Sequence, residues 1–493
     1  MIKKVLVLGG GSAGFLAALA LKVKLPQLQV DLIHSKDLGI IGVGEGSTLA
    51  LTDFLHRYLG ISLRKFFTTA QPTWKLGLRF LWGPRDHFHY TFSNHQLLGK
   101  VDGLRKQKGF YCWEEMLDED PFSALMERNR VFERQPNGNP AIHTTLAYHF
   151  ENEKFVRFLS EYAQAVGVSV SDDQMIEAQR GEQGIKALRF ASGRVESADL
   201  YIDCSGFASA LLGGSLGEGF VPYDRTLFCD RAVVGGWTRS SEPIKPYTAC
   251  ETMQSGWCWQ IEHETRINRG YVYSSAFISD DAAEGEFREK NPLITDTRVV
   301  KFTSGRYENF WVGNVVAIGN AGGFVEPLEA TALGVIAFQS RTLVEILRDG
   351  DLEATPFRRD QYNALHRRNW DSIRDFLAVH YRFNTRVDST FWRHCQEHCE
   401  LAGAVAPLEC YQENGPSSYY EQTVFDRPDQ FGFAGYFAML IGQKVPCKNP
   451  YQPTADERRI WENARGQHAA FATLGLTVPQ TLAAIRSPKW QWS

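Results

Sequence analysis

The feature that most constrains this chain is a glycine turn between a strand and a helix at its N-terminus. A short apolar run over 3–8 has the composition of a buried parallel strand. The sequence GGGSAG follows at 9–14, and 15–23 has the Ala- and Leu-rich composition of a buried helix. A second short strand is predicted over 30–34. Together these elements predict a complete βαβ unit.

Three glycines of this turn have the spacing of a dinucleotide-binding fingerprint. Gly9, Gly11 and Gly14 form G-x-G-x-x-G after a strand and before a helix. The first lets the chain turn, the second lets a pyrophosphate approach the backbone, and the third lets the helix pack on the strand. The N-terminus of the helix that follows offers free N–H groups and positive potential to the phosphates, and Ser12 and Ala13 in the turn are expected to contact the cofactor. We therefore expect a bound dinucleotide here.

The acid that usually ends the second strand and holds the ribose hydroxyls is missing. His34-Ser35 occupies that place. Either side chain can hydrogen-bond a ribose, and the alternative is that His34 merely ends the strand.

Strand signals recur far along the chain and imply a core that is discontinuous in sequence. Apolar runs at 198–203 and 314–318 each lead into a glycine-containing turn, and aromatic and polar residues alternate within 225–310, which suggests an antiparallel sheet. Residues 335–348 and 360–380 are helix-like. We expect an α/β protein whose discontinuous nucleotide-binding core, with inserted sheet segments, covers 1–375. A mostly helical portion over 376–493 would cover the substrate site.

The overall composition narrows the partners and the compartment. The net charge of -4 comes from 53 basic and 57 acidic residues, which argues against nucleic acid or an anionic membrane as the main partner. No apolar stretch approaches the ~20 residues of a membrane span, and the N-terminal apolar run passes into glycines instead of a signal-peptide cleavage site. The nine cysteines form no CxxC pair. We therefore expect free thiols and a cytoplasmic location.

A second glycine segment makes the likeness to one family specific. GGGSAGF at 9–15 followed by IGVGEGST at 41–48 resembles the N-terminal region of the flavin-dependent tryptophan halogenase family. By this resemblance the second segment contacts the cofactor through Val43, Gly44, Glu45 and Ser47. An ordinary glycine turn is the alternative.

Four further segments resemble the same family, in the same order along the chain. They are WKLGLRF at 74–80, DCSGF at 203–207, GWCWQI at 256–261 and GNAGGFVEPLEAT at 319–331. The matching segments extend from residue 1 to about 340, roughly two-thirds of the chain.

The resemblance implies an FAD-binding Rossmann-like core of the glutathione reductase and para-hydroxybenzoate hydroxylase type. Asn320 and Leu328 would also contact FAD, which would arrive as FADH2 from a separate flavin reductase, because the chain offers a single nucleotide fingerprint. In this family, reduced flavin and oxygen give a C4a-hydroperoxide, and a halide, chloride or bromide, attacks it to give hypohalous acid.

Two side chains match the reactive residues of the family. Lys75 corresponds to the active-site lysine, and Glu329 corresponds to the active-site glutamate. An ammonium can polarise hypohalous acid by hydrogen bonding, a neutral amine can form a haloamine, and both routes stay open. Glu329 would orient the electrophile and accept the proton lost by the ring. For a lysine taken at random, the alternative is a solvated surface amine.

Two further matches concern the halide and the wall between flavin and substrate. Thr331 and Ala332 match the backbone halide site of the family, which usually has glycine at the second position. Trp257 and Trp259 alternate on a strand and share a face. Core packing is the alternative to the family's wall between flavin and substrate. Glu262 replaces the proline of the family motif, a departure expected to reshape the loop after the strand.

The expected substrate is an electron-rich aromatic ring other than free tryptophan. Tryptophan-specific members carry E-F-x-x-F just after a tyrosine pair, whereas SYYEQTVFDRP at 418–428 keeps the pair, Tyr419-Tyr420, and lacks that pattern. Burying a zwitterion without partners costs several kcal/mol. We therefore favour an indole, phenol or pyrrole-like ring, alone or within a larger molecule. Phe92 would line the ring pocket by loose similarity to the family.

Other functions and sites stay open on the sequence alone. A flavin monooxygenase that hydroxylates aromatic rings shares the N-terminal fold but needs neither Lys75 nor Trp257, and a non-catalytic flavoprotein would only bind FAD. The pairs His394-Cys395 and His398-Cys399 invite a zinc site, but one helix presents too few of them in one direction. We expect a packed helix there and no metal site. A homodimer is one option for the assembly.

Overall fold

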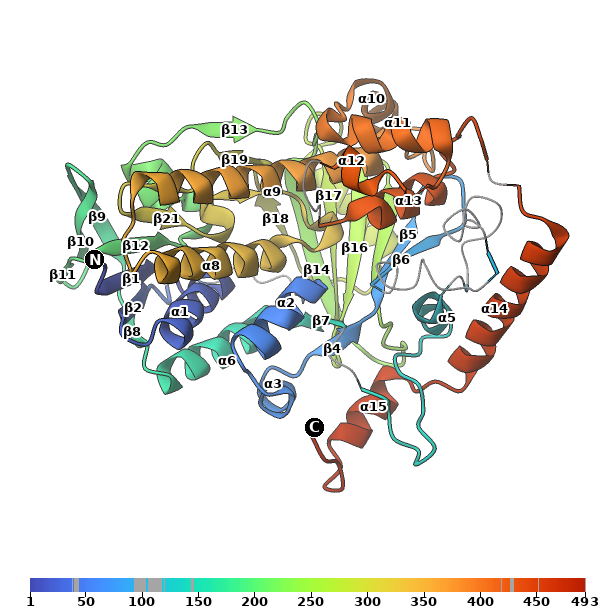
Figure 1. Ribbon diagram of the computed structural model, residues 1–493, viewed down its shortest axis with the longest axis horizontal. Coiled ribbons are helices and arrows are strands. Elements are labelled where there is room, and N and C mark those ends of the chain that lie inside the picture. Colours follow the sequence, from blue (N-terminus) through green and yellow to red (C-terminus); the bar gives the residue numbers. More distant parts are fainter. Residues whose placement is uncertain are drawn as a thin grey trace. The chain divides into compact units, whose positions relative to one another are not determined.

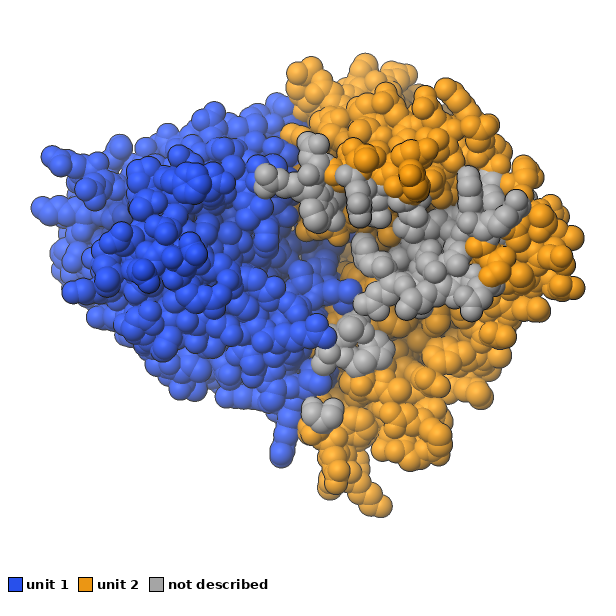
Figure 2. All heavy atoms as spheres, viewed as in Figure 1, with its two compact units in different colours: residues 1–72, 150–224, 302–371 blue, residues 73–149, 225–301, 372–493 orange. Residues whose placement is uncertain are grey.

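The computed structural model divides the chain into two compact units, each made of three separate stretches (Figure 2). Unit 1 comprises Met1–Pro72, Phe150–Asp224 and Phe302–Asp371, and unit 2 comprises Thr73–His149, Arg225–Lys301 and Ser372–Ser493. The residues that the structure describes are 1–37, 39, 44–92, 103–104, 118, 120–142, 146–417, 419–425, 430–450 and 452–492.

Unit 1 is built on a six-stranded sheet with the order β20-β21-β12-β1-β2-β8 (Figure 1). Strand β20 pairs antiparallel with β21, and the other pairs are parallel. The strands predicted over 3–8, 30–34, 198–203 and 314–318 are confirmed as β1, β2, β12 and β21. The strands of the sheet are β1 (Lys4–Leu8), β2 (Gln29–His34), β8 (Ser169–Asp172), β12 (Leu200–Asp203), β20 (Trp311–Val312) and β21 (Val315–Ala317).

Apolar side chains cover both faces of this sheet, which explains its almost continuously apolar strands. On one face, Leu6 and Leu8 pack against β10 (Gly184–Phe190) and the short helical turn Ala210–Ser215. The alternate residues of β1 point the opposite way, where α1 packs on the sheet and against α6 and α8. These helices are α1 (Ser12–Lys24), α6 (Asn152–Ala165) and α8 (Ala332–Asp349). The expected α/β core is therefore confirmed.

Shorter elements complete the description of unit 1. Two small sheets have the orders β11-β10-β9 and β13-β19-β22. The bounds of the remaining elements are β3 (Glu45–Gly46), α2 (Leu49–Asp53), α3 (Leu63–Thr69), β9 (Met175–Gly181), β11 (Val195–Glu196), β13 (Phe220–Pro222), β19 (Gly305–Tyr307) and β22 (Gly323–Phe324).

Unit 2 is built on a seven-stranded sheet with the order β18-β14-β17-β16-β15-β5-β6. Its neighbours pair antiparallel except β15 and β5, so the antiparallel sheet predicted within 225–310 is confirmed. The strands are β5 (Gly77–Leu81), β6 (Phe88–Thr91), β14 (Arg231–Thr238), β15 (Thr248–Met253), β16 (Gly256–Glu262), β17 (Arg266–Tyr273) and β18 (Thr297–Lys301). Outside this sheet, β4 (Thr73–Lys75) pairs antiparallel with β7 (Ala147–Phe150).

Helix α7 (Asp280–Lys290) lies within the segment predicted as sheet and was not expected. Ser279 caps its N-terminus, acidic residues occupy the first turn and basic residues the last, which are ordinary helix-end signals. Ala283 and Phe287 are one turn apart and pack against Cys258 on the sheet. The alternating pattern of the strands on either side hid this helix.

Helices dominate the C-terminal part of the chain. The helix-like stretches 335–348 and 360–380 are confirmed as α8 and α9 (Pro356–Arg382). The later helices are α10 (Thr390–His398), α11 (Val405–Asn414), α12 (Glu421–Val424), α13 (Gly432–Gly442), α14 (Ala455–Thr473) and α15 (Val478–Ile485). They belong to the same compact unit as the antiparallel sheet. The division into 1–375 and 376–493, with the second part covering a substrate, stays a prediction. Within the described ranges, no helix has the length and apolar character to cross a membrane.

Candidate active site

Two glycines of the turn after β1 have no room for a side chain, and the third has open space above it. A Cβ on Gly9, whose φ is +122°, would lie 2.2 Å from the Cys204 carbonyl oxygen, and a Cβ on Gly14 would lie 1.9 Å from the Gly9 carbonyl oxygen. A Cβ on Gly11 would meet nothing within 4 Å. Gly9 and Gly14 therefore serve the close approach of strand, turn and helix. Gly11 leaves space above the backbone, as a pyrophosphate would require.

The predicted cofactor segments meet at the carboxyl edge of the parallel sheet. Gly9 follows β1, His34 ends β2, Cys204 follows β12 and Gly319 lies just beyond β21. A Cβ on Gly319 would lie 3.1 Å from the Ala13 Cβ, so the late glycine segment touches the first turn of α1. Ligands of open α/β sheets bind at this edge.

His34 stands where the ribose-binding acid was expected. Its half-buried ring leaves no room for a side chain at Gly10, since a Cβ there would lie 2.4 Å from the imidazole. Burial lowers the pKa of His34, opposed by the nearby Asp172 carboxylate. A neutral imidazole can donate or accept one hydrogen bond with a ribose hydroxyl. The neighbouring Ser35 is also half-buried.

The second glycine segment is described from Gly44 onward, and Val43 lies outside the described residues. Gly44 has a φ of +79°, which favours glycine. Burial raises the pKa of Glu45 to about 7. Ser47 is fully buried. An acid with such a pKa can lie next to a phosphate-bearing cofactor in its neutral form.

Polar side chains form hydrogen bonds in the turn after β12 and in the glycine turn after β1. The buried Asp203 carboxylate accepts hydrogen bonds from the Ser205 side chain at 2.6 Å and from the Leu211 and Leu212 amides at 2.8 and 2.9 Å. Its role is therefore to hold the turn after β12. In the glycine turn after β1, Ser12 Oγ donates to Asn152 Oδ1 at 3.4 Å. Asn320 is half-buried, and Leu328 is fully buried.

The predicted halide turn begins an eighteen-residue helix of unit 1. Ala330 takes the left-handed conformation with φ of +53°, Thr331 is the N-cap of α8 and Ala332 is its first residue. First-turn amides have no partner within a helix, and the helix dipole adds positive potential there. Ala332 therefore needs no glycine conformation, and the family's glycine can be replaced without changing the backbone. Glu329, just before this turn, is 3% exposed.

Lys75 is completely buried in unit 2. It ends β4, opposite Ala147 on β7, and its Nζ lies 5.5 Å from the centroid of the Phe92 ring. The Phe92 amide donates to the Leu76 carbonyl at 2.9 Å, which holds the Phe92 backbone beside the residue that follows the lysine. Lys75 is thus not the solvated surface amine that the sequence left open.

Trp257 and Trp259 lie on β16 and point to the face opposite α7. Cys258 between them belongs to the cluster under α7, so the two indoles face the other way. Both are buried. Gly270 is paired with Trp259, and a Cβ there would lie 2.4 Å from the indole. The sequence therefore leaves room on β17 for this one side chain.

Glu262, which replaces the motif proline, forms a buried ion pair with Arg239. Its other carboxylate oxygen accepts from Gln260 Nε2 at 2.6 Å, and its carbonyl accepts from Thr73 Oγ1 at 2.6 Å. Arg239 also donates to the His263 carbonyl at 2.9 Å. The Glu262 side chain thus ties the end of β16 to Arg239 just after β14, a long-range partner that was not predicted, and the backbone carbonyl of Glu262 ties the same strand to β4.

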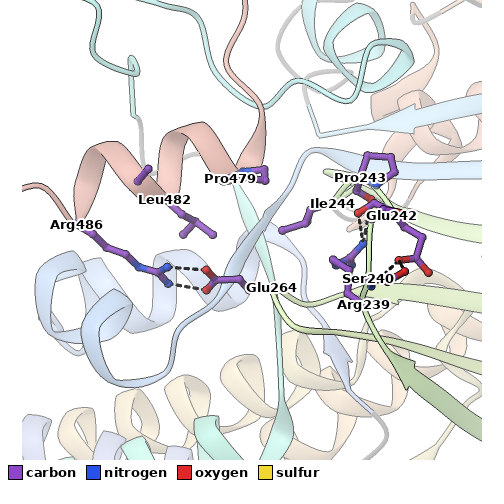
Figure 3. Close-up of a pocket in the computed structure, with 11 residues that line it drawn as sticks. Arg239, Ser240, Glu242, Pro243, Ile244, Glu264, Pro479, Leu482 and Arg486 are labelled. Carbon is purple, nitrogen blue, oxygen red and sulfur yellow. Dashed lines mark hydrogen bonds and ion pairs between the residues drawn. The ribbon is translucent and has the colours of Figure 1, made fainter.

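A hollow of about 480 Å³ lies beside this ion pair, between the segment 239–244 and α15 (Figure 3). Arg486 points at Glu264 and donates to both carboxylate oxygens at 2.6 Å. Glu242 accepts from Trp237 Nε1 at 2.8 Å. Each charged side chain that lines the hollow therefore has a partner in the protein. Its lining shares no residue with the predicted site.

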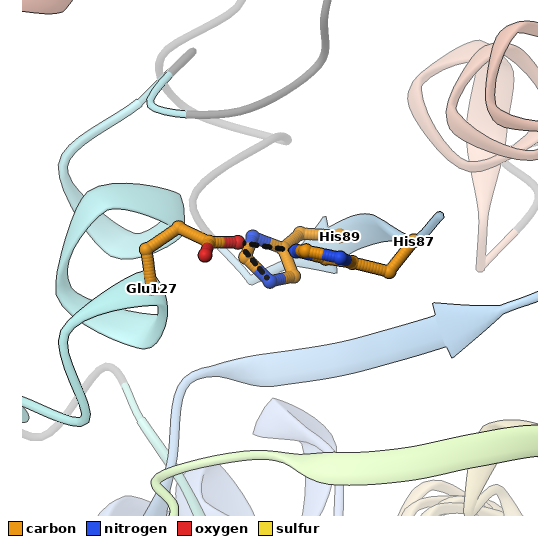
Figure 4. Close-up of side chains that lie close together, drawn as sticks. All are labelled: His87, His89 and Glu127. Atoms are coloured by element: carbon orange, nitrogen blue, oxygen red, sulfur yellow. Dashed lines mark hydrogen bonds and ion pairs between the residues drawn. The ribbon is translucent and has the colours of Figure 1, made fainter. Parts of the chain in front are cut away.

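Another polar cluster joins β6 to α5 (Pro121–Glu127) (Figure 4). His87, His89 and Glu127 are close enough to share a cation. The Arg79 guanidinium already supplies that charge, since its Nε donates to His89 Nε2 at 3.0 Å and it lies 3.3 Å from Glu127. Burial lowers the pKa of His89 to about 3. This is an ion-pair network that anchors the β5–β6 hairpin next to Lys75.

The paired cysteines of α10 and the segment after the tyrosine pair were also singled out in the sequence. Cys395 of α10 is fully buried and Cys399 Sγ lies 3.3 Å from the Thr226 carbonyl oxygen, so the predicted packed helix is confirmed. The cysteines within the described residues are free thiols. Tyr419 is 86% exposed, and Phe425 packs on Phe433 and Tyr436.

Comparison with known proteins gives one consistent result. The sequence profile described as tryptophan halogenase matches residues 4–458. The chain is 32% identical to tryptophan 7-halogenase KtzQ of Kutzneria sp. (strain 744), over 84% of this chain and 82% of that protein. It is 29% identical to tryptophan 7-halogenase RebH of Lentzea aerocolonigenes, over 90% of this chain and 89% of that protein. Among solved structures, MibH, a lanthipeptide tryptophan 5-halogenase, is 35% identical with a TM-score of 0.90. The match covers 98% of this chain and 93% of that chain.

Proposed function

The chain belongs to the tryptophan halogenase family, and we propose that it halogenates an indole within a larger molecule, with Lys75 and Glu329 as its reactive side chains. Its relatives establish it as a flavin-dependent halogenase of aromatic substrates and give no support to the alternative of an aromatic hydroxylase.

Unit 1 supplies the groups that fit the cofactor and the halide. Bound reduced FAD, with oxygen and a halide ion, supplies hypohalous acid. The open face of Gly11 and the N-terminus of α1 would take the pyrophosphate. The first amides of α8, at Thr331 and Ala332, would hold chloride or bromide through backbone N–H groups alone. Because unit 1 offers one nucleotide fingerprint, FADH2 would come from a separate flavin reductase.

The observation that carries the proposal is the complete burial of Lys75 against the Phe92 ring. A fully buried lysine is rare, because a cation loses its hydration there. Such a group is retained where its charge or its nucleophilicity is used. Lys75 would receive hypohalous acid, hydrogen-bond its oxygen and present the halogen to the ring. This restraint gives one product from an otherwise indiscriminate oxidant.

Glu329 would take the proton that the ring loses. Its carboxylate is almost wholly buried, and it precedes the left-handed Ala330 that fixes the turn into α8. A carboxylate held by rigid backbone suits a general base, which typically contributes a factor of about 10² to 10⁴. Trp257 and Trp259 would form a wall that keeps the ring away from the flavin.

The substrate class follows from what the chain lacks and what it resembles. The E-F-x-x-F pattern of tryptophan-specific enzymes is absent, so the charged head group of free tryptophan has no matching partners in this segment. The 35% identical MibH is described as acting on a lanthipeptide tryptophan. An indole carried by a peptide has no free amino-acid head group at the ring, which suits a site of this kind.

The test is turnover by the purified chain with reduced FAD and either chloride or bromide. The panel contains indole, free L-tryptophan, a tryptophan peptide and the same peptide with phenylalanine in place of tryptophan. Mass spectrometry should show one halogen added to the tryptophan peptide, dependent on halide, and nothing on the phenylalanine peptide. Halide-independent oxygen addition would contradict halogenation. Faster turnover of free tryptophan than of the peptide would contradict the substrate class.

A further inference from the structure

His149 is a fully buried histidine on β7 with one ring nitrogen unused within the described protein. Its Nε2 is hydrogen-bonded to Thr248 Oγ1 at 2.8 Å, and its Nδ1 has no hydrogen-bond partner. A buried polar atom left unpaired costs about 1–3 kcal/mol, so a protein retains one where something else pairs with it.

The register of β4 and β7 places this histidine next to Lys75. Thr73 is paired with His149 and Lys75 with Ala147, so the four side chains share one face of the pair. Lys75 and His149 are diagonal neighbours, a separation that a long and an aromatic side chain can bridge. Ala147, opposite Lys75, carries only a methyl group. The unused nitrogen therefore belongs to the surroundings of the buried lysine.

The imidazole is neutral under working conditions. Burial, the charge of Lys75 on β4 and the nearby His263 after β16 together hold the pKa of His149 well below its usual range. The carboxylate of Glu262 on the same loop is occupied by Arg239. With Nε2–H donating to Thr248, a neutral ring leaves a lone pair on Nδ1, the arrangement that a neighbouring ammonium favours.

We propose that His149 is a second binding residue for hypohalous acid, whose O–H donates to Nδ1 while the Lys75 ammonium donates to the same oxygen. This inference rests on the proposed function. Two hydrogen bonds fix the oxygen end of the oxidant and leave the halogen as the exposed end. One hydrogen bond from a flexible lysine would leave the O–X direction free to rotate.

The reaction then balances as HOX plus ArH giving ArX plus water. The ring carbon forms a bond to the halogen as the O–X bond breaks, and the electron pair of that bond goes to the oxygen. The departing hydroxide takes a proton from the Lys75 ammonium and becomes water. The ring proton goes to Glu329, which releases it to solvent, and the Lys75 amine takes up a proton from solvent, so both residues are restored. His149 keeps its protons throughout and acts only by binding.

The experiment uses two substitutions that separate the two ring nitrogens. In His149→Gln the longer amide reaches the place of Nε2 and can keep the bond to Thr248, but nothing replaces Nδ1. In His149→Asn the shorter amide reaches the place of Nδ1 and loses Thr248. The measured quantity is halogenated product per FADH2 oxidised, together with hypohalous acid captured by added taurine.

His149→Gln should lower product per FADH2 at least about tenfold, which is ~1.4 kcal/mol, and raise taurine halogenation correspondingly. His149→Asn should retain most of the product yield and lower the unfolding temperature instead. Wild-type yield in His149→Gln would overturn the inference, and so would equal losses of yield in both variants. If His149→Gln does not fold, a wild-type-like yield in His149→Asn supports the inference and a tenfold loss overturns it.

A measurement on the flavin-free chain tests the charge state independently. With ¹⁵N-labelled histidine, the His149 signals are assigned as those missing from His149→Asn. They should report a neutral ring with an unprotonated Nδ1 from pH 8 to pH 6. A protonated ring at pH 6 would overturn the inference. A wild-type chain without halide-dependent product would instead overturn the proposed function, so the two failures are distinct.

Discussion

The two units build their chemical groups in different ways. Unit 1 offers mainly backbone: an open glycine face after β1, and the first amides of α1 and α8. Unit 2 offers buried ionisable side chains, namely Lys75, His149 and the Glu262–Arg239 pair. A backbone site is fixed by local conformation, whereas a buried side-chain site depends on strands that pair across long stretches of sequence.

The difference teaches where function can be changed by a single substitution. Backbone N–H groups survive most substitutions, as Ala332 in the place of the family's glycine illustrates. Buried charges do not, because removing one partner leaves the other unpaired in a low-dielectric interior. We therefore expect the backbone halide turn of unit 1 to tolerate side-chain changes, Glu329 excepted, and the buried charges of unit 2 to be sensitive to them.

The largest effect on product formation is expected at Glu329 in unit 1. Glu329→Gln should lower product formation by a factor of about 10² to 10⁴, because an amide cannot accept the ring proton. Glu326→Gln is the matched control, since Glu326 is equally buried three residues earlier and has no assigned reactive role. Single-turnover product formation checks both variants. Equal losses in the two would remove Glu329 from the mechanism.

A large loss of stability is expected at the buried pair of unit 2. Glu262→Gln leaves Arg239 without its carboxylate and should cost about 3–5 kcal/mol in the free energy of unfolding. The double variant Glu262→Leu and Arg239→Met should recover part of that loss, because neither buried charge remains. Urea unfolding measures both. An unchanged midpoint for Glu262→Gln would show that this pair does not stabilise the end of β16 against the segment after β14.

A smaller effect is expected at the glycine turn of unit 1. Gly11→Ala should weaken FAD binding about tenfold and leave the unfolding temperature of the flavin-free chain unchanged, because the new Cβ occupies only open space. Gly14→Ala is the contrast, since its Cβ would collide with the Gly9 carbonyl and destabilise the fold. Fluorescence titration with FAD gives the affinity. Unchanged affinity in Gly11→Ala would place the pyrophosphate elsewhere.

The smallest effect concerns pH. The pKa of Glu45 is raised from 4.5 to about 7 by burial, so between these values the folded chain keeps a proton that the unfolded chain has released. Its contribution to stability is therefore present at acid pH and is lost as pH rises through 7. Glu45→Gln should raise the unfolding temperature more at pH 8 than at pH 5. An equal change at both values would contradict the raised pKa.

The same contrast explains what the sequence could predict. The β1–α1–β2 unit and the turn before α8 follow from local patterns, so their elements could be placed without coordinates. Thr248 bonds His149 across 99 residues of sequence, and no local signal links them. Arg239 likewise meets Glu262 only because β14 and β16 flank β17. The glutamate in place of the motif proline indicated an unusual position at residue 262, but the sequence did not identify Arg239 as its partner.

The most direct test of the division between oxidant formation and oxidant delivery is the fate of the oxidant in Lys75→Met. With reduced FAD, bromide, a tryptophan peptide and taurine present, flavin oxidation should proceed as in the wild type, peptide halogenation should vanish and halogenated taurine should rise in its place. Lys301→Met, at an exposed lysine of β18, should behave like the wild type. Undiminished peptide halogenation in Lys75→Met would contradict delivery by this lysine.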